Sequence, residues 1–115
     1  MADVKLRDFI FGMPSRFAAE KATGLQATIQ FLISGQDRGN FVLHIYNGTC
    51  TANEGLEESP TLTLRMSSET YIGMATGKLK GPQAFFMRKL RFEGETKLLM
   101  KMHSLFPSVH ENDLA

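Results

Sequence analysis

The dipeptide Asn47-Gly48 constrains the fold of this chain more than any other short feature of its sequence. It separates two segments with strand character, FVLHIY at residues 41–46 and TCTAN at residues 49–53. A type I′ turn requires positive φ at both central positions, and Asn followed by Gly meets that requirement at low cost. The sequence therefore predicts an antiparallel hairpin. Because its first strand is apolar on both faces, we expect that strand to be covered on both sides or to border a pocket.

Alternation of apolar and polar residues with a period of two predicts three further strands. These strands are expected at residues 25–34, 61–66 and 89–93. In the first of them, Ala27, Ile29, Phe31 and Ile33 share one face. With the hairpin, five strands are therefore expected.

Helix signals lie on both sides of the first four strands. Pro14 suits the first turn of a helix, and Gly24 ends the helix-forming run at residues 17–22. Residues 1–24 are therefore expected to form two short helical pieces. Ser67 or Ser68 is a candidate N-cap for a helix over residues 68–76.

Two more helices are expected in the last third of the chain. Gly81-Pro82 begins a short helix that runs through Phe86, because proline is well tolerated in a first turn. An amphipathic helix is expected over residues 95–105, ended by Pro107. Its apolar stripe consists of Leu98, Leu99, Met102, Leu105 and Phe106.

Composition and motif content argue against several classes of function. The net charge of +1 provides no electrostatic footprint for nucleic acid. Cys50 is the single cysteine, so we expect a small buried apolar residue and no disulfide. The three histidines lie far apart, so no metal site and no cofactor are expected.

Residues 73–79 resemble a truncated P-loop, but Leu79 stands where a magnesium-binding hydroxyl is needed. Catalytic hydrolase and metalloprotease motifs are missing.

The expected location is the cytoplasm. No apolar run approaches the roughly 20 residues that span a bilayer, and residues 1–16 lack the pattern of a secretion signal. Asn47-Gly48-Thr49 spells a glycosylation sequon, but in a cytoplasmic protein the turn interpretation is favoured.

Residues 77–94, GKLKGPQAFFMRKLRFEG, combine basic residues with the adjacent apolar residues Phe85, Phe86 and Met87. Five cations and no acids lie between residues 70 and 92: Lys78, Lys80, Arg88, Lys89 and Arg91. They form either a solvated rim or an electropositive lip that meets anionic head groups. Five of the seven methionines follow residue 65, and thioether side chains re-pack readily around varied ligands.

These motifs and their order resemble the sterol carrier protein type 2 family. The matching segments are GKL at residues 77–79, PQAFF at 82–86, KLRFEG at 89–94 and LLMKM at 98–102. The resemblance covers residues 25–106. Arg88 replaces a glycine that is usual in the family, and the N-terminal helical region is short. Both departures indicate a bacterial-type stand-alone member.

The resemblance implies an α+β fold, in which a five-stranded mixed β-sheet is covered by helices. In this family an apolar tunnel between sheet and helices takes sterols, fatty acids, fatty acyl-CoA and other lipids. The implied organisation is an N-terminal helical segment at residues 1–24, the lipid-binding domain at 25–106 and a flexible tail at 107–115.

Site residues follow from the same template. The residues expected to contact the lipid are Phe31, Phe41, Leu43, Met66, Tyr71, Met74, Phe85, Phe86, Leu98, Met102, Leu105 and Phe106. Phe85 and Phe86, with Met87, are expected to form an apolar wall of the tunnel. Lys78, Lys80 and Arg88 are expected at its polar rim, where the polar end of a ligand sits.

Three functions remain open from the sequence. The leading hypothesis is a non-enzymatic module that binds and transfers lipid-like ligands and makes transient contact with anionic membranes. The second is a structural or homodimerising accessory domain that presents a lipid intermediate or a partner to an enzyme. In that case the groove is filled by the domain's own side chains or by those of a partner. An enzyme acting on an apolar substrate is the third.

Overall fold

Five strands form one mixed sheet in the order β3-β2-β1-β4-β5. The computed structural model describes residues 6–107. The strands are β1 (Ala27–Ser34), β2 (Gly39–Tyr46), β3 (Thr49–Glu54), β4 (Leu62–Ser67) and β5 (Leu90–Gly94). Neighbouring strands are antiparallel except β1 and β4, which run parallel. The α+β class and the mixed five-stranded sheet expected from the resemblance are thus confirmed.

The hairpin between β2 and β3 has the predicted geometry. Asn47 and Gly48 have φ values of 51° and 73°, and the flanking Tyr46 and Thr49 are paired across the turn. Both central residues are therefore left-handed, as a type I′ turn requires.

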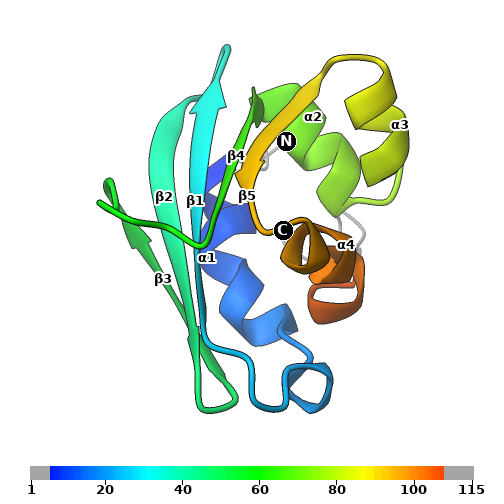
Figure 1. The fold of residues 1–115 in the computed structure, drawn as a ribbon. Coiled ribbons are helices and arrows are strands. Elements are labelled where there is room, and N and C mark those ends of the chain that lie inside the picture. Colours follow the sequence, from blue (N-terminus) through cyan, green and yellow to red (C-terminus); the bar gives the residue numbers. More distant parts are fainter. Residues whose placement is uncertain (1–5, 108–115) are drawn as a thin grey trace.

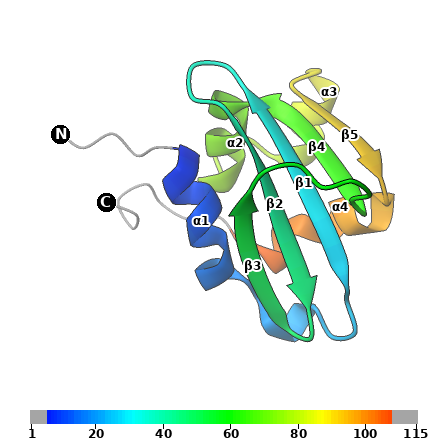
Figure 2. The same cartoon turned by 90° about the vertical axis from the view of Figure 1, so that its left-hand side faces the viewer.

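The connection from β3 to β4 crosses the outer face of the sheet (Figure 2). Buried Gln30 of β1 holds this connection against the sheet by two hydrogen bonds. The Gln30 Nε2 donates to the Gly55 carbonyl at 3.0 Å, and the Gln30 Oε1 accepts from the Glu57 amide at 2.6 Å. Val42, which pairs with Gln30 on this outer face, is 4% exposed. Residues 41–43 are therefore covered on both faces, whereas on the outer face His44 is half-buried and Tyr46 is 56% exposed, beside an open depression.

All helices lie on the other face of the sheet (Figure 1). They are α1 (Leu6–Arg16), the 3-10 turn η1 (Ala19–Lys21), α2 (Ser68–Ala75), α3 (Gly81–Phe86) and α4 (Thr96–Leu105). Ser67 caps α2 by accepting from the Thr70 amide at 3.1 Å, and Pro82 lies in the first turn of α3. Within residues 6–107, no helix is both long and apolar enough to cross a membrane.

The N-terminal helical region differs from its prediction in two ways. Pro14 does not begin a helix; it lies in the last turn of α1, where its missing N–H and its ring end the helix within two residues. The expected helix over residues 17–22 is reduced to η1. A run this short gains little from helix formation alone, and here Ala18 N–H donates to the Leu105 carbonyl instead.

Helix α1 is part of the same core as the sheet, since Leu6, Phe9, Ile10 and Met13 are all buried. Residues 6–24 therefore share the core of the lipid-binding domain that the resemblance places at 25–106. The flexible tail expected at residues 107–115 lies outside the described residues except for Pro107.

Candidate functional site

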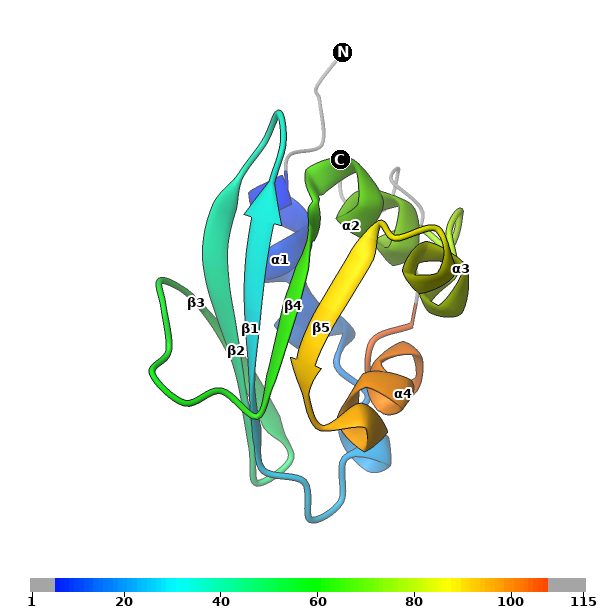
Figure 3. The ribbon, with the colours of Figure 1, turned by 45° about the horizontal axis from the view of Figure 1, so that its top comes forward.

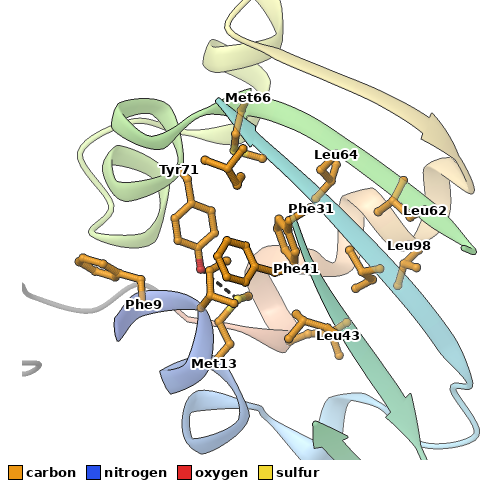
Figure 4. Close-up of a cluster of buried hydrophobic side chains, with 14 of the residues drawn as sticks. Phe9, Met13, Phe31, Phe41, Leu43, Leu62, Leu64, Met66, Tyr71 and Leu98 are labelled. Atoms are coloured by element: carbon orange, nitrogen blue, oxygen red, sulfur yellow. Dashed lines mark hydrogen bonds between the residues drawn. The ribbon is translucent and has the colours of Figure 1, made fainter. Parts of the chain in front are cut away.

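The apolar layer between sheet and helices contains most of the residues expected to contact a ligand. Phe31, Phe41, Leu43, Met66, Tyr71, Leu98 and Leu105 belong to one buried cluster, in part drawn in Figure 4. Met74, Met102 and Phe106 are half-buried and pack against it. The sheet supplies four of these side chains, Phe31, Phe41, Leu43 and Met66, through alternation, because every second residue of a strand faces the helices.

Buried side chains occupy this layer. Two open surface depressions among the described residues have volumes of about 480 Å³ and about 400 Å³. One lies beside the Asn47-Gly48 turn, and the other lies along residues 26–28 and 44–46, where Ala27 and Ile45 of the buried cluster form part of its lining. The interior positions expected for a tunnel wall thus serve as the packed core of the fold.

Tyr71 of α2 brings a polar group into this apolar layer. Its ring packs edge-on against Phe9 and Phe31, with ring centroids 6.4 Å and 5.7 Å away. Its hydroxyl points at the end of α1 and donates to the Met13 sulfur at 3.0 Å (Figure 4). Burial raises the pKa of Tyr71 well above its ordinary value, and the charge of nearby Arg16 opposes part of that shift. The phenol is therefore neutral and remains a hydrogen-bond donor.

Arg16, the last residue of α1, is the second polar group at this place. Its side chain folds back along the helix, and Nη2 donates to the Phe9 carbonyl at 2.9 Å. The guanidinium also hydrogen-bonds the Tyr71 hydroxyl, although Nη1 itself is buried without a partner of good geometry among the described residues. Sequence reasoning missed Arg16, because a cation in the last turn of a helix is ordinarily explained by the helix dipole.

Phe85 and Phe86 do not form an interior wall. Their side chains are 54% and 89% exposed, and Met87 is 51% exposed. Successive helical residues point about 100° apart, so three adjacent side chains cannot all face the core. The short helix α3 uses its buried position for Ala84 instead. Phe85 still packs against Phe92 of β5, at 5.6 Å between ring centroids, beside the sheet edge seen in Figure 3.

The predicted polar-rim residues lie on the surface. In the sequence they are close to these aromatic residues. Lys78, Lys80 and Arg88 are exposed. Within residues 6–107, neither Lys80 nor Arg88 forms an ion pair. Arg88 has a φ of 62°, a left-handed conformation that favours glycine and that here turns the chain from α3 into β5. These cations and the exposed apolar side chains are thus close together in the sequence, and both lie on the surface and away from the apolar interior.

Groups capable of metal or thiol chemistry are not assembled in this structure. The described residues contain no group of three His, Cys, Asp or Glu side chains that could hold a metal ion. Cys50 is half-buried on β3, and burial raises the pKa of its thiol to about 11. The sequence predicted a buried apolar residue here, and the structure leaves Cys50 half-buried.

Comparison with known proteins agrees with the fold. The model of the SCP-2 sterol transfer family matches residues 12–107. Hydroxysteroid dehydrogenase-like protein 2 of Xenopus tropicalis is 32% identical over 81 residues, which are 70% of this chain and 19% of that protein. This chain therefore spans about a fifth of the length of the curated relatives it matches.

Two solved structures illustrate the range of proteins that contain this fold. The palmitated SCP2L2 protein of Aedes aegypti has a TM-score of 0.73 at 16% identity, over 94% of this chain and 99% of that one. The sec-alkylsulfatase Pisa1 from Pseudomonas sp. has a TM-score of 0.78 at 23% identity, over 89% of this chain and 16% of that enzyme. Given the family match over most of its length, this chain belongs to the SCP-2 sterol transfer family.

Proposed function

We propose that this chain binds a lipid-like ligand in the apolar layer between its sheet and its helices and carries it without chemical change. The observation that carries the proposal is one continuous apolar cluster under α1, α2 and α4, in a fold whose Aedes aegypti representatives have been solved with palmitate. Fatty acids, fatty acyl-CoA, sterol-like and isoprenoid lipids all present the long apolar surface that such a layer would cover.

Entry of a ligand would replace contacts between side chains with contacts to the lipid. Met74 and Met102 are suited to this exchange, because both are half-buried and methionine changes shape at low cost. Among the described residues, helix α4 is tied to the rest of the chain by apolar burial and by one backbone hydrogen bond at each end, from Glu95 N–H to the Thr61 carbonyl and from Ala18 N–H to the Leu105 carbonyl. A lipid tail would enter by moving α4 outward between these two ties.

Exchange with a membrane is proposed to use the surface around α3. Phe86 is 89% exposed there, and the cations Lys80 and Arg88 lie within six residues of it in the chain. An anionic bilayer offers both an apolar phase and negative head groups, and each cation near such a surface contributes about 1 kcal/mol. This contact would bring the lipid carrier to the source or the acceptor of its ligand.

A second candidate is an accessory domain that presents a lipid or a partner protein to an enzyme, with or without homodimerisation. Two observations favour it: side chains fill the interior, and relatives such as Pisa1 contain the fold as a small part of a larger enzyme. In either case the proposed role is non-enzymatic. The cytoplasmic location remains a prediction.

One experiment separates the two candidates. Freshly purified protein is measured by native mass spectrometry, and the organic extract is analysed for lipid. A co-purified lipid, or saturable uptake of a fluorescent fatty acid, supports the carrier. A bare mass without uptake refutes the carrier and favours the accessory domain, and a mass of twice 12.9 kDa would identify a homodimer.

A further inference from the structure

The methionines of residues 6–107 differ widely in their exposure to solvent. Four of them are buried or half-buried: Met13, Met66, Met74 and Met102. Met87 and Met100 are the two exposed methionines of the described chain, at 51% and 70%. A thioether is oxidised by a peroxide where the oxidant can reach the sulfur, so oxidation should begin at these two residues.

The backbone holds Met87 at the surface. This residue directly follows α3, and its N–H donates to the Gln83 carbonyl at 2.9 Å. The next residue, Arg88, has the left-handed φ of 62° that turns the chain into β5. Because the chain is fixed on both sides of Met87, its exposed side chain is a constant feature of the surface around α3.

The two exposed methionines have different surroundings. Phe85 and Phe86 directly precede Met87 in the chain, and both are exposed, so Met87 extends an apolar part of the surface. Met100 lies on α4, where residues three or four positions away are its neighbours on the helix surface. The exposed ones among these neighbours are all polar: Thr96, Lys97 and His103. Oxidation of Met87 would therefore alter an apolar surface, and oxidation of Met100 would alter a polar one.

We propose that Met87 is an oxidation site that controls the contact of this chain with an anionic bilayer. Hydrogen peroxide transfers one oxygen atom to the Met87 sulfur: its O–O bond breaks, an S–O bond forms, and the remainder leaves as water. The sulfur loses two electrons, and the peroxide gains them. The product is a sulfoxide, which is polar where the thioether was apolar, and methionine sulfoxide reductases reverse the change.

This inference rests on the membrane contact proposed for the surface around α3. Lys80 and Arg88 supply the electrostatic attraction to anionic head groups, and Phe86 supplies an exposed apolar side chain. Met87 adds a second apolar side chain that can enter the edge of the bilayer. A sulfoxide is costly to transfer from water into an apolar phase, so oxidation should weaken the contact while the charges stay the same.

The test measures the modification and the contact separately. After treatment with hydrogen peroxide, peptide mass spectrometry should find one added oxygen on Met87 and Met100 before any on Met13 or Met66. Affinity for vesicles of phosphatidylcholine and phosphatidylglycerol should then fall about threefold to thirtyfold, as expected when part of one methionine side chain leaves an apolar phase. Met87→Leu has a similar volume and no sulfur, so peroxide should leave its affinity unchanged. Met100→Leu is the matched control and should lose affinity as the wild type does.

Each outcome decides a separate question. Unchanged vesicle affinity of wild-type protein oxidised at Met87 overturns the inference but leaves the membrane contact intact. An equal loss of affinity in peroxide-treated Met87→Leu also overturns it, because the loss then comes from another residue. Failure of the untreated wild type to bind anionic vesicles overturns the membrane contact and the inference together. Urea unfolding of the oxidised protein verifies that the core is intact, and recovery of affinity after treatment with methionine sulfoxide reductases supports the proposal.

Discussion

Replacing Gly94 with alanine is expected to destabilise the junction between β5 and α4. Gly94 has a φ of +118° and is paired with Leu62 of β4. An added Cβ would lie 2.9 Å from the Leu62 Cα and closer still to the Thr61 carbonyl oxygen. Both are backbone atoms that cannot rotate away, and the same carbonyl accepts a hydrogen bond from the Glu95 amide at 3.1 Å. The clash would therefore push β5 away from β4 and displace the start of α4.

Two costs add up in this variant. A left-handed or otherwise positive φ costs an L-residue about 1–2 kcal/mol, and forcing a methyl group into filled space costs about 1–3 kcal/mol more. Urea unfolding should therefore show a loss of about 2–5 kcal/mol for Gly94→Ala. Gly24→Ala is the matched control, because Gly24 has a φ of +74° but no atom within 4 Å of the added Cβ. Gly24→Ala should be destabilised only by the unfavourable positive φ. Equal losses of unfolding free energy in the two variants would refute the steric explanation.

Three further predictions concern the interior, the surface and the single thiol. Met102→Ala should cost about 1 kcal/mol or less and shift ligand preference toward bulkier lipids, whereas Leu105→Ala, in the core at 0% exposure, should cost about 2–5 kcal/mol in urea unfolding. A large loss for Met102→Ala with unchanged fatty-acid affinity would place this residue in the core only. Charge reversal of Lys80 and Arg88 together should slow lipid transfer to anionic vesicles more than to neutral ones at low salt. Equal slowing on both vesicle types would show that these cations are merely solvated. Because burial raises the pKa of Cys50 from 9.0 to about 11, iodoacetamide at pH 8 should label it about 100-fold more slowly than a free thiol, and labelling at the free-thiol rate would contradict that shift.

Local sequence signals predicted the sheet and most of its connections. Asn47-Gly48 required a hairpin, alternation placed Leu62, Leu64 and Met66 on one face, and Ser67 capped α2. The parallel pairing of β1 with β4 had no local signal and was not predicted; the resemblance implied only that the sheet is mixed. This pairing depends on the connection that crosses the sheet from β3 to β4. Buried Gln30 holds that connection through hydrogen bonds to residues 55 and 57, which are far from it in the sequence and give no local signal.

The N-terminal region and α3 were predicted less well, for a shared physical reason. Pro14 was assigned to a first turn because proline is common there, but the burial of Leu6 and Phe9 extends the helix before it. Phe86 was assigned to the interior because it is large and apolar, but the position of α3 at the edge of the sheet leaves it exposed. In both segments tertiary packing outweighed the local preference.

Apolar residues alone do not distinguish a lipid site from an ordinary core in a protein of this kind. Phe31, Phe41 and Leu43 would face the helices in either case, because both a core and a ligand tail select the same side chains. Polar groups make the distinction, since a core excludes an unpaired donor whereas a ligand site requires one. Arg16 and Tyr71 bring polar groups into this interior, but they hydrogen-bond each other, the Phe9 carbonyl and the Met13 sulfur, so they do not make the distinction here. Uptake of a lipid by the freshly purified protein is therefore the measurement that shows which kind of interior this is.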